Sequence, residues 1–366
     1  MMNMLIVCGG TGGHLSPGIA VAEELCRKGH RCRLLISQKQ VDSALVQKYP
    51  HLEFIKVPGR AFSGGLFARM RSLFALMQSF LYARKLLKTS QPDIVLLFGG
   101  FLSLGLGLAA RWTRLPFALH EANSVPGKTS RLLKKLASRI YLPEGVRLPQ
   151  VGLDRIRYYG YPVRADIQPL NKLEARRRLG IDESGKLLVI IGGSQGAMAL
   201  NNWVCEHFEA LAQHGVAVYC VSGLGKSDPQ LMHAADASGR EVCAKFVPFT
   251  EQMEAVMSAA DLVVSRAGAG SVAELIRCCK PAILVPYPYA ADGHQQGNAA
   301  MHQQRGAGVM VEETALATLL DEVLALIHND WLLNTFRKNL LALDRFDSSQ
   351  MIADDLVQLT QSRYES

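Results

Sequence analysis

The stretch MLIVCGGTGGHLSPG, residues 4–18, decides the fold. Its first five residues form an uninterrupted apolar run, which is typical of a buried parallel strand. A glycine-rich turn follows, and the apolar residues after it recur at helical spacing, with a helix start predicted at Ser16-Pro17. Glycines let the backbone approach a ligand closely, and the N–H groups at a helix N-terminus favour negative charge. The stretch predicts an anion site; the alternative is a tight turn whose glycines serve only its geometry.

The length and composition indicate a globular protein of two domains. The 366 residues exceed one typical core, and 49% hydrophobic with 20% charged residues is not the composition of a disordered chain. A net charge of +8 suits a phosphorylated substrate, an anionic membrane surface or nucleic acid. Nucleic acid is the least favoured partner, because basic residues neither form blocks nor interleave with aromatic ones.

The cysteines and apolar runs predict a location in the cytosol. The 8 cysteines form no C-x-x-C pair, and we expect them to be reduced core residues. No cleavable signal is recognised, because the first apolar run ends in glycines. The charge-free run 94–110 is shorter than the roughly 20 residues of a spanning helix. Glycines interrupt it, so it predicts a buried strand, a turn and a helix.

Polar residues in the first half follow the ends of predicted strands. Strands are expected at 33–37, 53–57, 93–98 and 117–120. In an open parallel sheet the carboxyl ends of strands share one edge, where ligands bind. We therefore expect the opening loop, Gly99-Gly100-Phe101 and the loop 120–127 to lie together. The polar side chains expected to converge there are those of His14, His120, Glu121 and Asn123.

Residues 66–88 have a helical pattern with two interpretations. In one, the stripe of Leu66, Met70, Leu73, Met77, Phe80 and Leu81 packs into the core while basic residues are solvated. In the other, the apolar residues exceed one core stripe and contact an acidic lipid surface.

The second half repeats the opening theme. The pattern breaks at 158–164, where a domain boundary is expected, and a strand at 186–191 then runs into Gly192-Gly193-Ser194-Gln195-Gly196 and a helix. Further strands are predicted at 216–221, 242–246, 262–265 and 282–285. Two Rossmann-like halves of this kind suggest doubly wound domains that face each other across a cleft.

A second informative region is 265–298. Arg266 to Ser271 opens a helix that contains Glu274, whose carboxylate is expected either to hold a ribose or to cap the helix. Gln295 and Gln296 are either ordinary helix-start residues or partners of sugar hydroxyls. Beyond residue 314 only helices are predicted, and the last of them would brace the first domain.

Six motifs in this order closely resemble the MurG family, which moves N-acetylglucosamine from UDP-N-acetylglucosamine onto lipid I to give lipid II. The motifs are GGTGGH at 9–14, HEAN at 120–123, GYPVR at 160–164, GGSQGA at 192–197, 266–274 and 292–298. The resemblance covers nearly the whole chain. It implies an α/β GT-B fold, with an acceptor domain at 1–163 joined by a helix in 341–366, and a donor domain at 164–340.

The resemblance also implies a role for each matching residue. Ser194 and Arg164 would meet the donor diphosphate, Glu274 the ribose, and the backbone at Thr250 the uracil. Gln295 and Gln296 would contact the donor sugar. The remaining donor-side positions lie at the start of one helix: Ala269, Gly270, Ser271, Val272 and Ala273. From the first domain, the donor sugar and acceptor diphosphate would be met by Thr11, Gly12, Gly13, His14 and Asn123. The segment 66–88 resembles a membrane-contacting patch.

The family inverts the anomeric centre, which requires one in-line displacement and a base for the acceptor hydroxyl. His14 is the first candidate because an imidazole ordinarily titrates near working pH. Glu121 is the second and His120 the third, and the alternative for His14 is a hydrogen bond to sugar or phosphate. No Asp-x-Asp motif occurs, so no essential metal and no cofactor are expected.

Three rival functions remain. A nicotinamide-dependent dehydrogenase fits poorly, because the third glycine of G-x-G-x-x-G would fall on Leu15 and no acidic residue ends the second strand. A sugar-nucleotide epimerase or a glycolipid synthase of the same fold is nearer. A non-catalytic nucleotide-binding module is the third.

Overall fold

The computed structural model describes residues 1–8, 12–36, 45–57, 66–182, 184–193, 197–226 and 228–364. The chain forms two compact units. The N-terminal unit contains Met1–Arg164 and Arg345–Ser366, and the C-terminal unit contains Ala165–Asp344. The sequence places the boundaries at 163/164 and 340/341, and the structure divides the chain at 164/165 and 344/345. The roles of acceptor and donor domain stay predictions.

The N-terminal unit is built on a parallel sheet whose described strands have the order β3-β2-β1-β4-β5-β6-β7. The order reverses between β1 and β4, as in doubly wound folds. The strands are β1 (Asn3–Val7), β2 (Arg31–Ile36), β3 (Glu53–Lys56), β4 (Ile94–Leu97), β5 (Phe117–His120), β6 (Arg139–Tyr141) and β7 (Ile156–Arg157). The middle strands are uniformly buried, which explains their continuous apolar sequences.

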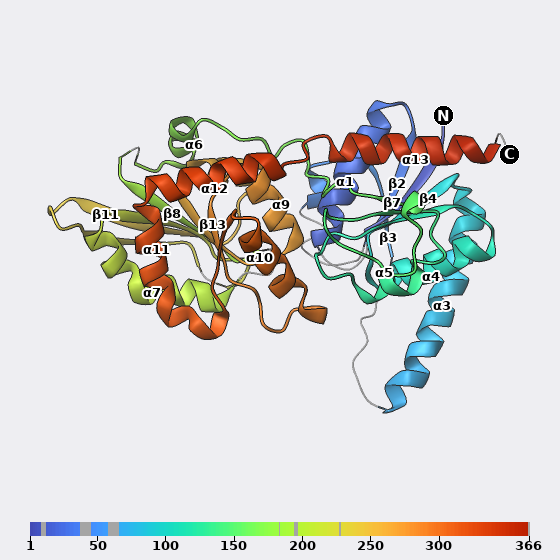
Figure 1. Ribbon diagram of the computed structural model, residues 1–366, viewed down its shortest axis with the longest axis horizontal. Coiled ribbons are helices and arrows are strands. Elements are labelled where there is room, and N and C mark those ends of the chain that lie inside the picture. The colour runs from blue at the N-terminus through green and yellow to red at the C-terminus, as the bar shows by residue number, and fades with distance from the viewer. Residues whose placement is uncertain are drawn as a thin grey trace. The chain divides into compact units, whose positions relative to one another are not determined.

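Helices cover this sheet (Figure 1). They are α1 (Gly12–Arg27), α3 (Leu66–Ser90), α4 (Gly100–Trp112), α5 (Lys128–Leu133) and α13 (Ser348–Tyr364), with the 3₁₀ helix η1 at Leu153–Arg155. The last helix, α13, returns from the far end of the sequence to lie along α1, as predicted (Figure 1). Ile352, Ala353 and Leu356 of α13 are buried in the same core as Leu15 and Ile19 of α1.

The first helix begins earlier than the sequence predicted. It starts at Gly12 rather than at Ser16-Pro17, so Pro17 lies inside it. A proline has no N–H, and the carbonyl of Gly13, four residues before, therefore loses its ordinary helical donor. The hydroxyl of Tyr161 donates to that carbonyl over 3.2 Å. A side chain 148 residues later in the sequence thus supplies the donor that the proline lacks.

The C-terminal unit contains a second sheet, in which the described strands have the order β10-β11-β9-β8-β12-β13-β14. Every pair is parallel except the hairpin of β10 and β11. The strands are β8 (Lys186–Ile191), β9 (Val216–Val221), β10 (Gln230–Ala235), β11 (Glu241–Val247), β12 (Leu262–Ser265), β13 (Ala282–Leu284) and β14 (Gly308–Met310). The predicted pair of Rossmann-like sheets is therefore present.

The helices of this unit pack on both faces of its sheet (Figure 1). They are α6 (Lys172–Leu179), α7 (Met198–Gln213), α8 (Met253–Ala259), α9 (Ala269–Arg277), α10 (His294–Gln304), α11 (Leu319–Ile327) and α12 (Asp330–Leu343). Two 3₁₀ helices are η2 (Ala291–Gly293) and η3 (Glu313–Thr318).

Two predictions about burial are wrong. The stripe on α3 is not a core stripe over its described part, because Met77 is 53% and Leu81 54% exposed, while Ala83 and Leu87 of the same helix are buried. The cysteines are all free, but they are not all core residues. Cys205 is exposed, and Cys26, Cys243 and Cys279 are half-buried.

Candidate active site

The first half of the candidate site lies at the carboxyl edge of the N-terminal sheet. Val7 of β1 pairs with Leu97 of β4, and Leu97 pairs with Leu119 of β5. The carboxyl ends of these three strands therefore lie side by side, as the sequence predicted, and residues 9–11 of the opening loop lie outside the described residues. The reversal of strand order between β1 and β4 creates the crevice in which open α/β sheets bind ligands.

His14 lies at this reversal point, in the first turn of α1. Its ring lies beside Gly99, the residue before α4: a Cβ added at Gly99 would come within 3.6 Å of Nε2 of His14. Gly99 has a φ of 98°, which glycine adopts without strain, so the loop after β4 passes the ring with bare backbone. His14 is half-buried and retains access to a ligand at this edge.

Glu121 organises the loop after β5. Its carboxylate is buried, and both oxygens accept hydrogen bonds. Oε1 accepts from the backbone N–H of Asn123 at 3.0 Å and from its side-chain amide at 3.1 Å. Oε2 accepts from the N–H of Gly127 at 2.8 Å and from the hydroxyl of Ser130 at 2.7 Å. Gly127 is the N-cap of α5, so Glu121 also places negative charge at that helix N-terminus.

His120 is a buried structural residue. Its Nε2 donates to the carbonyl of Gly160 at 3.2 Å, and its ring lies 4.9 Å from that of Phe98. Burial lowers the pKa of His120 to about 4, and the nearby imidazole of His14 contributes in the same direction. The ring is therefore neutral at physiological pH. It fixes the polypeptide around Gly160 to the end of β5.

Other predicted residues of the first domain are placed as follows. Gly12 and Gly13 form the first turn of α1, and Asn123 lies in the loop organised by Glu121. Arg164 is buried at the end of the N-terminal unit, where its Nη1 donates to the hydroxyl of Tyr49 over 3.4 Å. Thr11 lies outside the described residues. The roles that these residues would have toward a substrate stay predictions.

The second half of the candidate site lies at the carboxyl edge of the C-terminal sheet. Ile191 of β8 pairs with Ser265 of β12 at the point where the strand order reverses. Three residues separate the end of β12 from helix α9, which has Gly268 as an N-cap with no side chain to bond the first N–H groups. A helix N-terminus of this kind is suited to bind an anion. The helix includes Ala269, Gly270, Ser271, Val272, Ala273 and Glu274; Ser194 lies outside the described residues.

Two residues that the sequence did not single out as site residues fix the approach to α9. The guanidinium of Arg266 is buried, donates to the carbonyl of Val285 at 3.2 Å and forms an ion pair with Glu313. Asn298 of α10 donates to the carbonyl of Ala267 over 3.0 Å. The loop before α9 is thus held from two directions. Only the position of both residues inside conspicuous motifs indicated them.

The predicted sugar-binding residues are distributed over three elements. Glu274 lies in the second turn of α9 rather than the first, so the alternative of a capping carboxylate is wrong. Gln295 accepts from the N–H of Tyr287 at 2.9 Å, and Gln296 donates to Glu312 at 2.9 Å. The hydroxyl of Thr250 accepts from the N–H of Gln252 at 3.0 Å. Each amide retains further hydrogen-bonding capacity for a ligand.

Comparison with known proteins agrees with this two-part arrangement. Residues 4–142 match the glycosyltransferase family 28 N-terminal domain, and residues 187–344 match the glycosyltransferase family 28 C-terminal domain. The crystal structure of Acinetobacter baumannii MurG matches 98% of this chain and 99% of its own with a TM-score of 0.74 and 23% identity. The crystal structure of a putative UDP-N-acetylglucosamine 2-epimerase from Listeria monocytogenes matches 96% of this chain and 94% of its own, with a TM-score of 0.70 and 12% identity. These likenesses establish the GT-B fold.

Sequence identity decides the family within that fold. The UDP-N-acetylglucosamine--N-acetylmuramyl-(pentapeptide) pyrophosphoryl-undecaprenol N-acetylglucosamine transferase of Opitutus terrae is 47% identical over 362 residues, which are 99% of this chain and 96% of the relative. Both family 28 domains occur in one chain and in the same order as the two sheets. By its sequence and its fold, the chain belongs to glycosyltransferase family 28 and, within it, to the MurG family.

Proposed function

We propose that this chain transfers N-acetylglucosamine from UDP-N-acetylglucosamine to the muramyl 4-hydroxyl of lipid I, and so forms lipid II for peptidoglycan. The observation that carries this function is the 47% identity with the Opitutus terrae transferase over 99% of the chain. Another UDP-sugar enzyme of the same fold, an epimerase or a glycolipid synthase, is the alternative. The fold alone does not separate these activities, since the epimerase from Listeria monocytogenes shares it.

The C-terminal unit supplies the donor site in this proposal. The N-terminus of α9 faces the diphosphate, and the N–H groups after Gly268 stabilise the charge that develops when UDP leaves. Ser194 is a further diphosphate partner, and Arg164, the last residue of the first segment of the N-terminal unit, is another. Glu274 hydrogen-bonds the ribose, and Gln295 and Gln296 hold the sugar. The second-turn position of Glu274 supports its role, because a carboxylate there does not serve as a cap.

The N-terminal unit supplies the acceptor site and the base. His14 takes the proton of the acceptor hydroxyl while that oxygen forms its bond to the anomeric carbon. The bond from this carbon to the diphosphate oxygen breaks in the same step, and UDP leaves with the electron pair. The anomeric centre is therefore inverted. The position of His14 at the reversal of strand order, beside the bare backbone of Gly99, supports this role.

Glu121 is the weaker candidate for the base. Its two oxygens accept four hydrogen bonds, three from Asn123 and Gly127 of its own loop and one from Ser130 of α5. To take a proton from the acceptor, this carboxylate would first have to break at least one of these hydrogen bonds. We assign it to holding Asn123 at the edge of the sheet, where the amide serves the acceptor diphosphate.

We further propose that α3 and α4 dock the enzyme on an anionic membrane at its cytoplasmic face. Phe74 is 56% exposed on α3, and Trp112 at the end of α4 is 69% exposed. The rings of Phe80 and Trp112 meet edge to face at 6.3 Å. Met77 and Leu81 of α3 are exposed as well, and exposed apolar residues grouped in this way mark sites of contact with proteins or membranes.

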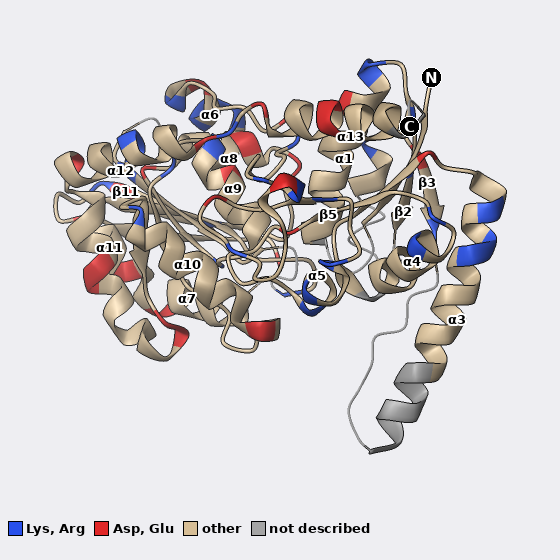
Figure 2. Ribbon diagram, turned by 45° about the vertical axis from the view of Figure 1, so that its right-hand side comes forward, with Lys and Arg blue, Asp and Glu red and all other residues tan. Residues whose placement is uncertain are grey.

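Basic residues surround this apolar surface. Between Phe74 and Ser90, α3 has three cationic side chains, Arg84, Lys85 and Lys88, and no acidic one (Figure 2). A groove of about 440 Å³ between α3 and α4 is lined by Phe80, Leu108, Arg111, Trp112 and Arg114. Guanidinium groups beside aromatic rings suit the boundary between lipid phosphates and acyl chains. Within the described residues, no helix is both long and apolar enough to span a bilayer, and the proposed attachment is peripheral.

The activity is tested by incubating the full-length protein with radiolabelled UDP-N-acetylglucosamine and a lipid I analogue. The proposal predicts that label moves to the lipid and that no label moves when the lipid I analogue is omitted. Release of free sugar, or an epimerised nucleotide, would identify the alternative enzymes. Bound donor without turnover would identify a non-catalytic module. Each of these three outcomes contradicts the proposal.

A further inference from the structure

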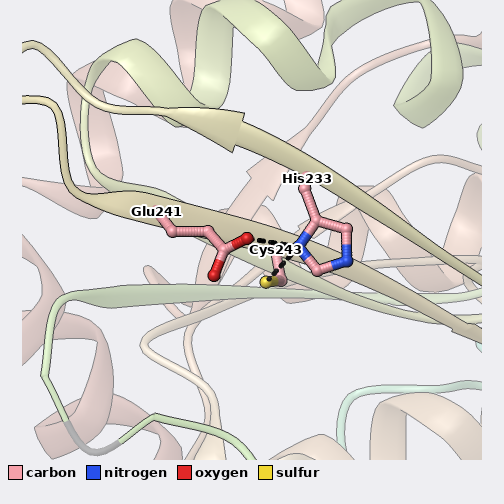
Figure 3. A group of neighbouring side chains, drawn as sticks. All are labelled: His233, Glu241 and Cys243. Carbon is pink, nitrogen blue, oxygen red and sulfur yellow. Dashed lines mark hydrogen bonds and ion pairs between the residues drawn. The ribbon is translucent and has the colours of Figure 1, made fainter.

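Three side chains with metal-binding donor atoms meet on the hairpin of β10 and β11, at the edge of the C-terminal sheet (Figure 3). Nδ1 of His233 lies 2.8 Å from Oε1 of Glu241 and 3.4 Å from Sγ of Cys243. The three donor atoms all lie within 4.8 Å of one another. The proposed transferase reaction does not involve these residues.

The sheet itself brings the three residues together. His233 pairs directly with Cys243 across the antiparallel register, and Glu241 precedes Cys243 by two residues. Residues two apart on a strand share a face, so Glu241 is the diagonal neighbour of His233. Val242, Ala244 and Phe246, on the opposite face of β11, are buried in the core and fix the strand. The arrangement is therefore set by the register of the hairpin rather than by a loop.

Hydrogen bonds within the group do not serve all three side chains at once. A proton on Nδ1 of His233 can be donated to Glu241, but the same nitrogen then has no lone pair for the thiol of Cys243. The other tautomer accepts from the thiol and leaves the carboxylate without its donor. A cation at the centre of the three atoms would serve all of them at once.

The two separations made by Nδ1 of His233 can be compared with those around a tetrahedral ion. With bond lengths of about 2.0 Å to nitrogen or oxygen and about 2.3 Å to sulfur, tetrahedral ligands lie roughly 3.3 to 3.6 Å apart. The separation of Nδ1 and Sγ, 3.4 Å, already meets this value. The carboxylate has to withdraw by roughly half an ångström, and the side chain of Glu241, which is 70% exposed, has room to do so.

We propose that His233, Glu241 and Cys243 bind a zinc ion that clips the two strands of this hairpin together. Thiolate and imidazole ligands favour zinc over magnesium and calcium, which prefer oxygen. Cys243 loses its proton to solvent on binding, and His233 binds through neutral Nδ1. The thiolate and the carboxylate then neutralise the ion. The side chain of His233 is 49% exposed, so water reaches the fourth position.

Cobalt titration of the metal-free, full-length protein tests the proposal. Cobalt(II) adopts zinc sites, and a bond to thiolate gives a near-ultraviolet charge-transfer band. We expect this band to saturate at one equivalent and zinc to displace it. The variant C243S should lose the band. The variant E241Q should bind cobalt at least about 10- to 100-fold more weakly than the wild type. This is the loss of affinity seen when a metal site loses only an outer hydrogen-bond partner.

The variant C205S is the matched control, because Cys205 is an exposed cysteine of the same unit on α7 and should leave the band unchanged. Circular dichroism verifies that each variant is folded. One equivalent of zinc should also raise the thermal midpoint of the wild type but not of C243S. The proposal is overturned if binding occurs only at large metal excess, if C243S keeps the band, or if C205S loses it.

Discussion

At the scale of single residues, three neighbouring side chains that the sequence ranked as possible bases have different surroundings. His120 is buried and donates to a backbone carbonyl, and Glu121 is buried beneath four donors. His14 is half-buried beside a glycine at the edge of the sheet. In the sequence, His14 was ranked first by residue type alone. In the structure, burial and hydrogen-bond partners disfavour His120 and Glu121 as the base and support the same choice.

The variant Glu121→Gln tests the structural role of the carboxylate. A glutamine amide turns two of the acceptor positions into donors that face other donors. Loss of a charged hydrogen bond costs about 1.5 to 3 kcal/mol, and we expect the free energy of unfolding in urea to fall by this order. Glu144→Gln, at an exposed position on the same unit, should change it little. Unchanged stability together with abolished turnover would instead identify Glu121 as the base.

The buried ring of His120 predicts a pH dependence of stability. Its pKa is about 4 in the folded protein, below the ordinary value of 6.5. The unfolded chain therefore binds a proton first as pH falls, and stability is full above pH 6.5 and declines until about pH 4. The loss is on the order of 3 kcal/mol. In urea unfolding between pH 7 and 4, His120→Gln, whose amide takes the position of Nε2 and does not titrate, should give a flatter profile; an identical slope would contradict this origin.

At the scale of elements, the sequence predicted what apolar runs and glycine turns determine locally. The strands at β8, β9 and β12, the helix α4 after Gly99 and the returning helix α13 all lie where the sequence indicated. The shared edge of β1, β4 and β5 was also predictable, because parallel connectivity alone brings their carboxyl ends together.

The remaining elements depend on tertiary contacts that a local pattern does not contain. β7 has two residues and β14 three, too few for a periodicity. β10 has no β-branched residue and exists as the partner of β11. The early start of α1 depends on Tyr161, which follows Gly13 by 148 residues. The hydrogen bonds to both oxygens of Glu121 could not be predicted either, because they depend on the conformation of the chain between Glu121 and Ser130.

Helix α3 predicts a membrane-binding defect. Replacing Phe74, Met77 and Leu81 together by serine removes apolar area that would enter the lipid boundary. We expect affinity for vesicles that contain anionic lipid to fall at least about tenfold, and the residual binding to weaken further with salt. Trp331→Ser with Leu341→Ser, on the equally exposed surface of α12, is the control. Equal loss in both variants, or none in the first, contradicts the proposed docking surface.

At the scale of the molecule, each unit has its own sheet and core, and the chain returns to the first unit at its end. Asp355 attaches α13 to the rest of the N-terminal unit. Its carboxylate, which is buried, accepts from the hydroxyl of Tyr141 at 2.9 Å and pairs with Arg139 at 2.8 Å. Nε of Arg157 lies 3.6 Å from the other oxygen of the same carboxylate. Helix α13 is thus part of the N-terminal unit in energetic terms as well as in position.

Two adjacent aspartates test this attachment. Asp355→Ala leaves the half-buried Arg139 and Arg157 without their carboxylate partner, which should cost about 3 kcal/mol, the lower end for a broken buried pair. Asp354→Ala removes an exposed pair with Lys28 and should cost less than about 1 kcal/mol. Calorimetry should show that Asp355→Ala destabilises the transition of the N-terminal unit and leaves that of the C-terminal unit in place. Similar effects of the two substitutions would contradict this account of α13.

The central claim for the whole molecule is that the N-terminal unit supplies the base and the C-terminal unit the donor site. The most direct test is the steady-state rate of sugar transfer by His14→Ala, with the concentration of UDP-N-acetylglucosamine varied. We predict that kcat falls roughly 100- to 10,000-fold, as for loss of a general base, while the KM for the donor changes little. Near-normal turnover of His14→Ala, with turnover abolished in Glu121→Ala, would contradict the claim.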